Sequence, residues 1–187
     1  KYVKENQKKT VEFVAQAYDV EAVLLAENLY GISVYQDDVY DIIISNEPQL
    51  QKITFSDHIL FVPNGYKLDV GGEKALLTVG NAIKGQLSKI REIQIQGHAD
   101  TDSTTRFSSN LHLGAYRAIE VFQFLQKRVG IDPVQNQMSV ASFGEYMPVQ
   151  RSETDAGFNA QKLSQANLTQ EMKARNRRIE LRLFYRY

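Results

Sequence analysis

The chain has 187 residues, and its 43% hydrophobic and 10% aromatic content suits a folded domain with a core and an appendage. Its 22 Lys and Arg balance its 22 Asp and Glu, so no overall positive charge is present to bind a nucleic acid or an anionic membrane surface. The absence of cysteine excludes disulfides, thiolate nucleophiles and Cys-ligated zinc.

The first fifty residues predict a helical lead-in followed by a strand. From Val3 to about Leu29 most apolar residues are spaced as on one face of an amphipathic helix, with a break near Asp19. Val39–Ser45 is rich in β-branched residues and predicts a strand. The chain opens at Lys1 inside the helical pattern and without Met, so we expect it to be part of a longer protein. We expect residues 1–50 to form a dimerisation or plug-like segment.

Helices and strands alternate after residue 50, which predicts an α/β sandwich with helices packed on one sheet over residues 51–187. The first expected elements are a strand at 53–55, a helix after Gly71-Gly72 whose apolar stripe is Leu76, Val79, Ile83 and Leu87, and a strand at 91–96. A polar loop at 98–109, a helix, a strand at 138–143, a polar loop with a short helix at 149–170, and a strand at 178–187 follow.

Two of these elements carry expectations about their faces. Asn110 suits the N-cap of the second helix, and six apolar residues are expected on its core side: Leu111, Ala115, Ala118, Ile119, Phe122 and Leu125. In the last strand the apolar residues alternate with polar ones, which predicts one face in solvent: Arg178, Glu180 and Arg182.

Four blocks of this sequence resemble, in the same order, the signatures of the OmpA/MotB family of peptidoglycan-binding domains. They read IQIQGHAD, SSNLHLGAYRAIEV, VASFGEYMPV and NRRIEL. The similarity spans roughly Ile53 to Leu183, and the SSN-x-x-L and FGEYMPV blocks are similar to the MotB stator branch. The resemblance implies an OmpA-like βαβαβ domain with its helices on one mixed sheet, and a site for the diaminopimelate of the peptidoglycan stem peptide.

The resemblance also implies which residues bind this ligand. The aspartate of the G-H-x-D block is Asp100, and the arginine of the L-x-x-x-R-A block is Arg117. The free end of diaminopimelate is a zwitterion, so a carboxylate for its ammonium and a guanidinium for its carboxylate are chemically apt. We expect this pair to be exposed, so that truncating it weakens binding without lowering stability.

Four further residues match the family blocks. Asn110 and Leu113 would lie beside the ligand, although Asn110 is equally compatible with a role as a helix cap. Arg177 and Arg178 match the N-R-R block, where one arginine would orient Asp100 or the ligand. The sequence departs from the family pattern at Ala99, where a threonine is usual, and in its longer loops, which bears on affinity.

The same residues are compatible with other roles, as a salt bridge, a metal site or a hydrolase. Asp100 and Arg117 are also compatible with an internal salt bridge. His98, Asp100 and Asp102 resemble a metal-binding or hydrolytic loop, but the other candidate ligands lack motif spacing: Glu92, His112 and Glu120. The serines of the loop lack a G-x-S-x-G elbow. We therefore expect a binding module with no catalytic residue, metal or cofactor.

The resemblance leaves the parent protein open among three classes. The leading one is the periplasmic part of a MotB-like stator subunit, a homodimer held in the inner membrane by a missing N-terminal span beside a MotA-like ion-channel partner. The Tyr-rich, acidic segment from Tyr18 to Asp41 makes the MotB-like subunit of Zorya anti-phage systems an alternative. The others are a static OmpA-like or lipoprotein anchor between outer membrane and wall, and an enzyme of wall metabolism.

Overall fold

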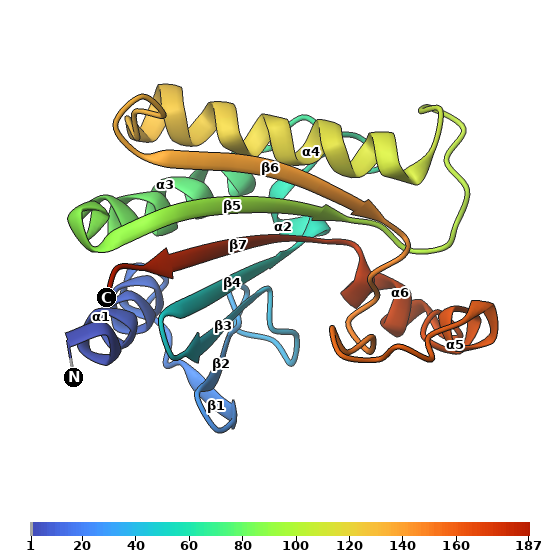
Figure 1. Cartoon of the computed structure of the whole chain (residues 1–187), viewed down its shortest axis with the longest axis horizontal. Coiled ribbons are helices and arrows are strands. Elements are labelled where there is room, and N and C mark those ends of the chain that lie inside the picture. Colours follow the sequence, from blue (N-terminus) through green and yellow to red (C-terminus); the bar gives the residue numbers. More distant parts are fainter. Residues whose placement is uncertain (1) are drawn as a thin grey trace.

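A seven-stranded mixed sheet runs through the whole chain, in the order β1-β2-β3-β4-β7-β5-β6 (Figure 1). The computed structural model describes residues 2–187. The strands are β1 (Val23–Ala26), β2 (Leu29–Ile32), β3 (Ile42–Glu47), β4 (Leu50–Ser56), β5 (Ile90–His98), β6 (Gln137–Gly144) and β7 (Arg178–Tyr185). The α/β fold class with helices on one mixed sheet is therefore confirmed.

The helices divide into a layer on the sheet and a pair beyond its end (Figure 1). They are α1 (Tyr2–Ala17), α2 (Asp57–Leu60), α3 (Val70–Lys84), α4 (Asn110–Phe124), α5 (Ala160–Gln165) and α6 (Gln170–Asn176). A 3-10 turn (Leu87–Lys89) follows α3, and a π-helical turn (Leu125–Val129) extends α4 as far as Gly130, whose φ of 84° favours glycine. The predicted long polar loop contains α5, as expected.

The position of β7 determines which loops meet. This last strand lies between β4 and β5 and pairs antiparallel with both, whereas β5 and β6 pair in parallel. At one edge of the sheet Ser56 and His98 both lie opposite Arg178. The residues that follow β4 and β5 therefore meet the residues that precede β7.

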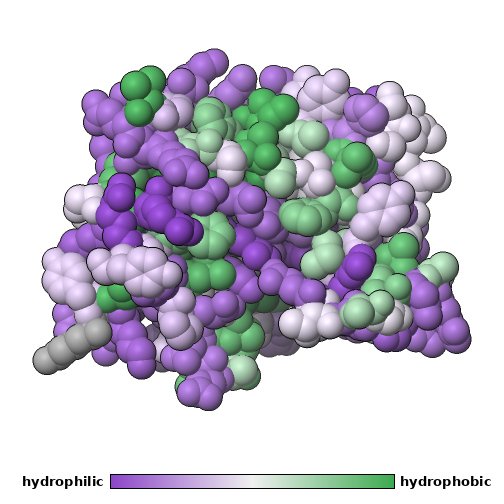
Figure 2. All heavy atoms as spheres, viewed as in Figure 1, coloured by the Kyte–Doolittle hydropathy of each residue, from purple (hydrophilic) through white to green (hydrophobic). Residues whose placement is uncertain are grey.

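One face of the sheet forms the core with α1, α3 and α4, and the other is polar. Alternate residues of the central strands are fully buried among the helices: Ile53, Phe55, Ile93, Ile95, Ile179, Leu181 and Leu183. The intervening positions of β5 and β7 carry Gln94, Gln96, Glu180 and Arg182. The view in Figure 2 shows a mostly hydrophilic surface with apolar residues in scattered groups.

The prediction for the N-terminal segment was partly wrong. The helix ends at Ala17 and not at Leu29, because the chain turns at Asp19, whose φ is 54°, and then enters the β1–β2 hairpin. The apolar stretch Val23–Ala26 is compatible with a helix or a strand, and its pairing with β2 decides between them. The strand expected at 39–45 lies at 42–47.

The apolar stripe of α1 is buried within this chain. Val11, Val14 and Ala15 belong to the main core, where α1 contacts α3 and β3. The predicted boundary at residue 50 falls at the tight turn between β3 and β4, which pair along their length. The segment before residue 50 thus shares one sheet and one core with the rest, and its stripe gives no reason to expect a dimer.

Two predictions about faces were only partly right. Of the residues expected on the core side of α4, Ala118 and Leu125 are fully buried. The buried residues of α4 are Asn110, Gly114, Arg117, Ala118, Val121 and Phe124, while Leu111 and Ile119 are exposed. The helix is rotated because it packs against β5 through glycines: a Cβ on Gly97 would lie 2.0 Å from the Gly114 carbonyl oxygen. In β7, Arg178 and Glu180 are buried, so the face expected in solvent is partly covered.

No helix within residues 2–187 is both long enough and apolar enough to span a membrane.

Candidate functional site

Three charged residues meet at the edge of the sheet where β4 and β5 end and β7 begins. Asp57 directly follows β4, Asp100 lies two residues beyond β5, and Arg177 directly precedes β7. The backbone N–H of Asp57 donates to the Arg177 carbonyl at 3.0 Å, which continues the β4–β7 pairing by one residue. The topology of the sheet, and not sequence proximity, brings these residues together.

Arg177 joins the two aspartates. Its Nη1 donates to Asp100 Oδ2 at 2.6 Å, and its Nε lies 3.3 Å from Asp57 Oδ2. A charged donor and acceptor at such distances form a strong, charge-assisted interaction. The match of the N-R-R block had suggested that one arginine would orient Asp100, and Arg177 contacts that side chain directly.

Arg117 approaches Asp57 from α4. Its Nη1 lies 3.5 Å from Asp57 Oδ2, its Nε donates to the Gly65 carbonyl at 2.9 Å, and its guanidinium lies 4.9 Å from the centre of the Phe61 ring. The four charged groups therefore alternate in sign, in the order Arg117, Asp57, Arg177, Asp100. We call these four residues the ionic chain.

Burial differs sharply along the ionic chain. The side chains of Arg117 and Asp100 are only 4% and 6% exposed, whereas that of Arg177 is 32% exposed. Desolvation lowers the pKa of Arg117, and the nearby Arg177 lowers it further, while Asp57 opposes the shift. Burial alone would also lower the pKa of Arg177, but Asp100 and Asp57 together raise it above its usual value. The expectation of an exposed pair is therefore wrong.

Asn110 holds the backbone of the loop after β5. Its side-chain amide donates to the carbonyl oxygens of Asp100 at 3.1 Å and Asp102 at 2.9 Å. The cap of α4 is instead Ser109, whose side chain accepts from the backbone N–H of His112. The alternative that Asn110 is the helix cap is therefore wrong, and its amide fixes the loop that carries Asp100.

A local turn and a cross-link from α6 hold the same loop. Asp100 Oδ1 accepts from the backbone N–H of Asp102 at 2.8 Å, and Lys173 Nζ lies 2.7 Å from Asp102 Oδ1. Asp100 thus uses one oxygen for the turn and the other for Arg177. This arrangement fixes the orientation of its carboxylate.

The remaining two predicted residues lie outside the ionic chain. Leu113 is half-buried on the first turn of α4. Arg178 points to the opposite side of the sheet from Arg177, where it donates to the Met147 carbonyl at 3.0 Å and lies 3.6 Å from Glu180 Oε2. Adjacent residues at the start of a strand face opposite ways, so the N-R-R block supplies one arginine to each side.

Asp57 was missed by the sequence analysis although it contacts both arginines of the ionic chain. The available signal was its place as the first acidic residue after the strand at 53–55. Its relevance depends on β4 lying beside β7, which the sequence alone does not reveal. Three aromatic rings were also missed; Tyr66, Phe107 and Tyr116 pack with their centres 5.4 to 5.9 Å apart.

The ionic chain has the chemistry to exchange its internal pairs for those of a ligand. A ligand ammonium can take the place of a guanidinium group beside an aspartate, and a ligand carboxylate can take the place of an aspartate beside an arginine. A zwitterionic ligand can therefore replace internal ion pairs with pairs of the same kind. Within residues 2–187, no group of three or more His, Asp or Glu side chains is placed to hold a metal ion. His98, in particular, contacts Gln96 and Glu180 and not Asp100.

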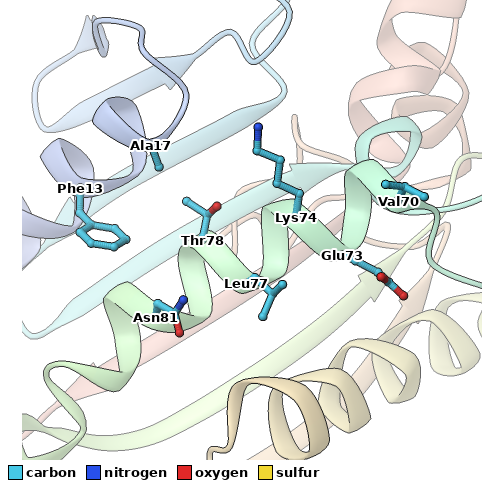
Figure 3. A pocket seen from close by; sticks show the side chains of 8 residues that line it. All are labelled: Phe13, Ala17, Val70, Glu73, Lys74, Leu77, Thr78 and Asn81. Atoms are coloured by element: carbon cyan, nitrogen blue, oxygen red, sulfur yellow. The ribbon is translucent and has the colours of Figure 1, made fainter.

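A separate hollow of about 380 Å³ lies between α1 and α3. Figure 3 shows Phe13 on α1 directed toward α3, with Thr78 and Asn81 opposite. Its charged lining residues are Glu73 and Lys74. None of the lining residues belongs to the ionic chain and none is an arginine, so we do not assign the site there.

Comparison with known sequences identifies one family. The sequence profile of the OmpA family matches residues 60–162, a span that includes Asp100, Asn110, Leu113 and Arg117. Asp57, Arg177 and Arg178 lie outside the matched span. A search of curated protein sequences finds no significant match.

Several solved structures share the fold. A putative MotB-like protein from Desulfovibrio vulgaris is 20% identical, with a TM-score of 0.67 over 100% of this chain and 98% of that one. The periplasmic domain of Helicobacter pylori MotB (residues 78–256) is 16% identical, with a TM-score of 0.65 over 86% and 89%. The cell wall anchor of the type VI secretion system (T6SS) from Pseudomonas aeruginosa is 22% identical, with a TM-score of 0.59 over 78% and 89%.

Proposed function

Because this chain belongs to the OmpA family, we propose that it binds peptidoglycan without catalysing a reaction, and that the ionic chain receives the free end of diaminopimelate in the stem peptide. The observation that carries this proposal is the alternation of two carboxylates and two guanidinium groups at one edge of the sheet. Its carboxylates are complementary to the ammonium of a zwitterion, and its guanidinium groups to the carboxylate. The name of the P. aeruginosa neighbour, a cell wall anchor, supports the same role.

In the proposed complex Asp100 binds the ligand ammonium and Arg117 binds the ligand carboxylate. Arg177, which is the most exposed of the three, moves aside and continues to neutralise Asp57. The site is already oriented before the ligand arrives, since Asn110 fixes the loop and Gly65 fixes Arg117. Pre-orientation lowers the entropy lost on binding.

Co-sedimentation with purified sacculi tests this proposal. We expect Asp100→Asn and Arg117→Lys each to weaken binding about a hundredfold, because each removes a charge-assisted contact while nearly keeping side-chain volume. The matched control is Arg175→Ala on α6, whose side chain is 71% exposed and pairs with Glu171 on the same helix. This variant should bind like the parent.

The wall chemistry provides a second arm of the experiment. Sacculi with lysine at the third stem position should bind more weakly, because lysine lacks the terminal carboxylate for Arg117. If the parent protein binds neither kind of sacculus, or if both site variants sediment like Arg175→Ala, the ionic chain is only a structural element.

We propose further that the parent protein is a MotB-like stator subunit in the periplasm, paired with a second copy and an ion-channel partner. The fold shared with two MotB-type domains supports this assignment. A MotB-like subunit of an anti-phage motor and a static wall anchor are the alternatives, the second favoured by the P. aeruginosa neighbour. The upstream sequence decides: a single span with an acidic residue indicates a stator, and a lipobox or β-barrel indicates a static anchor.

A further inference from the structure

A second hollow, of about 280 Å³, lies against the polar face of the sheet, on the other side of β7 from the ionic chain. Side chains of β5, β6 and β7 form its floor, and the segment that follows β6 forms its wall. The lining residues are Gln96, His98, Phe143, Met147, Arg151, Glu153, Arg178 and Arg182. Nothing in the proposed wall-binding role uses this hollow.

His98 is the unusual residue in this hollow. It is only 3% exposed, and its ring stacks on Phe143 with centres 5.1 Å apart and planes 6° from parallel. Its Nε2 lies 3.1 Å from Gln96 Oε1, and the amide nitrogen of Gln96 is itself used to donate to Gln94. We assign the ring proton to Nε2, because Gln96 Oε1 can only accept; with this assignment Nδ1 keeps a lone pair.

That lone pair has no hydrogen-bond partner within residues 2–187. The nearby Met147 carbonyl is an acceptor too, and it already accepts from Arg178 Nη2. Burial, together with Arg178 and Arg182, lowers the pKa of His98 to about 2, against an opposing effect of the Met147 backbone. An unpaired acceptor in a buried position is uncommon, because its lost hydration is not replaced.

Guanidinium groups gather around the same hollow. Arg182 donates from Nε to Glu180 and from Nη2 to Glu153, both at 2.9 Å, and Arg151 donates from Nη1 to the Tyr146 carbonyl at 2.8 Å. The hollow and its floor hold three arginines against two glutamates, with a neutral histidine. The Glu153 side chain is 61% exposed, so it can leave Arg182 for solvent when an anion replaces it.

We propose that this hollow binds a small anion that also carries a hydroxyl group, with Arg151 and Arg182 contacting the anionic oxygens and Nδ1 of His98 accepting the hydroxyl proton. Monohydrogen phosphate and 2-hydroxycarboxylates have this combination of groups. The hollow has room for either. This site is independent of the ionic chain, because Arg177 and Arg178 direct their side chains to opposite sides of the sheet.

Two pairs of probes test the proposal on the unmodified protein at pH 7. Monohydrogen phosphate and sulfate share shape and charge, but sulfate lacks a proton to donate; lactate and propionate differ by one hydroxyl group. We expect about tenfold tighter binding within a pair for the member with the hydroxyl, the effect of one hydrogen bond. Titration calorimetry measures the affinity, and the ¹⁵N chemical shift of His98 Nδ1 reports the contact.

The two pairs separate the sources of the ligand. A preference in the phosphate pair indicates inorganic phosphate, and one in the lactate pair indicates a 2-hydroxycarboxylate with a free hydroxyl group. Equal binding within both pairs, no binding at millimolar concentration, or a shift absent from Nδ1 each overturns the proposal. In those cases the hollow is a structural gap in an ion-pair network.

Two variants sharpen the result in opposite directions. His98→Phe keeps an aromatic ring against Phe143 and removes the acceptor, so the preference within each pair should disappear. Glu153→Gln removes the carboxylate that competes for Arg182, so both phosphate and sulfate should bind several-fold more tightly. Weaker anion binding by Glu153→Gln contradicts the proposed place of the anion at Arg182.

Discussion

Two charged clusters lie back to back across the start of β7, and they are built on different principles. The ionic chain alternates aspartates with arginines, so each buried charge has a partner of opposite sign. The cluster around His98 surrounds a neutral, buried ring with arginines and leaves one ring nitrogen unpaired. The first cluster offers charge pairs to a ligand, and the second offers a hydrogen-bond acceptor that burial and two nearby arginines keep unprotonated.

The N-R-R block contributes one arginine to each of the two clusters. Arg177 and Arg178 are neighbours in the N-R-R block, yet Arg177 contacts Asp100 while Arg178 contacts Met147 and Glu180. Strand geometry explains the division, since successive side chains point to opposite faces. Removing an arginine should therefore affect sacculus binding in the ionic chain but not in the cluster around His98.

Removing the buried arginine of each cluster should have the largest effect. Arg117→Ala leaves the Gly65 carbonyl without this donor, while Asp57 keeps Arg177. Arg178→Ala leaves the Met147 carbonyl without its donor, while Glu180 keeps Arg182. Loss of one partner of a buried pair typically costs about 3–5 kcal/mol of unfolding free energy. We expect losses of this order for both variants, measured by urea denaturation.

Binding should separate the two variants. At a temperature where both remain folded, Arg117→Ala should fail to sediment with sacculi and Arg178→Ala should sediment like the parent. If Arg178→Ala loses binding while its circular dichroism is unchanged, then the two clusters do not act separately.

The second expected effect is a specific sensitivity of the His98 cluster to acid. Burial, together with Arg178 and Arg182, lowers the pKa of His98 from its usual 6.5 to about 2 in the folded chain. Between these values the unfolded chain binds a proton that the folded chain does not, so stability is lost as the pH falls below 6.5. The slope for one group approaches about 1.4 kcal/mol per pH unit, which amounts to about 2 kcal/mol between pH 6.5 and 4.5.

A variant that lacks only His98 isolates this contribution. His98→Phe should unfold with a pH dependence that is shallower by up to about 1.4 kcal/mol per unit over the same range. His112→Phe on the exposed side of α4 is the matched control and should keep the slope of the parent. Equal slopes for the parent and His98→Phe would show that His98 titrates normally in the folded protein.

The sequence predicted the fold class and the central elements well because their patterns are local. Ile93 and Ile95 alternate with polar residues, and Leu76, Val79 and Ile83 form a helical stripe, so period alone identifies the strand and the helix. The prediction of a helix up to Leu29 was wrong because the residues from Val23 to Ala26 are compatible with a helix or a strand. Their pairing with β2 makes them a strand. Long-range pairing is absent from a local pattern.

The candidate site could be predicted only in part for the same reason. The family blocks identified Asp100, Arg117 and Arg177, which do lie in one ionic chain. Asp57 follows from the sheet order β4-β7-β5, and the burial of Arg117 follows from the contact of Gly97 with Gly114. Neither fact has a signature within a short window of sequence.

The smallest expected effect separates the role of Asn110, which holds the loop that carries Asp100, from that of Ser109, which caps α4. Ser109 caps α4, and Asn110 holds the Asp100 and Asp102 carbonyls. Ser109→Ala should lower the free energy of unfolding by about 1 kcal/mol, as expected for a lost N-cap, and should leave sacculus binding unchanged. Asn110→Ala should cost a similar free energy but weaken binding about tenfold, because the loop that orients Asp100 loses two hydrogen bonds. Urea denaturation and co-sedimentation measured on the same two proteins decide the matter. Equal binding by both variants would mean that the turn at Asp102 and the contact with Arg177 orient Asp100 without help from Asn110.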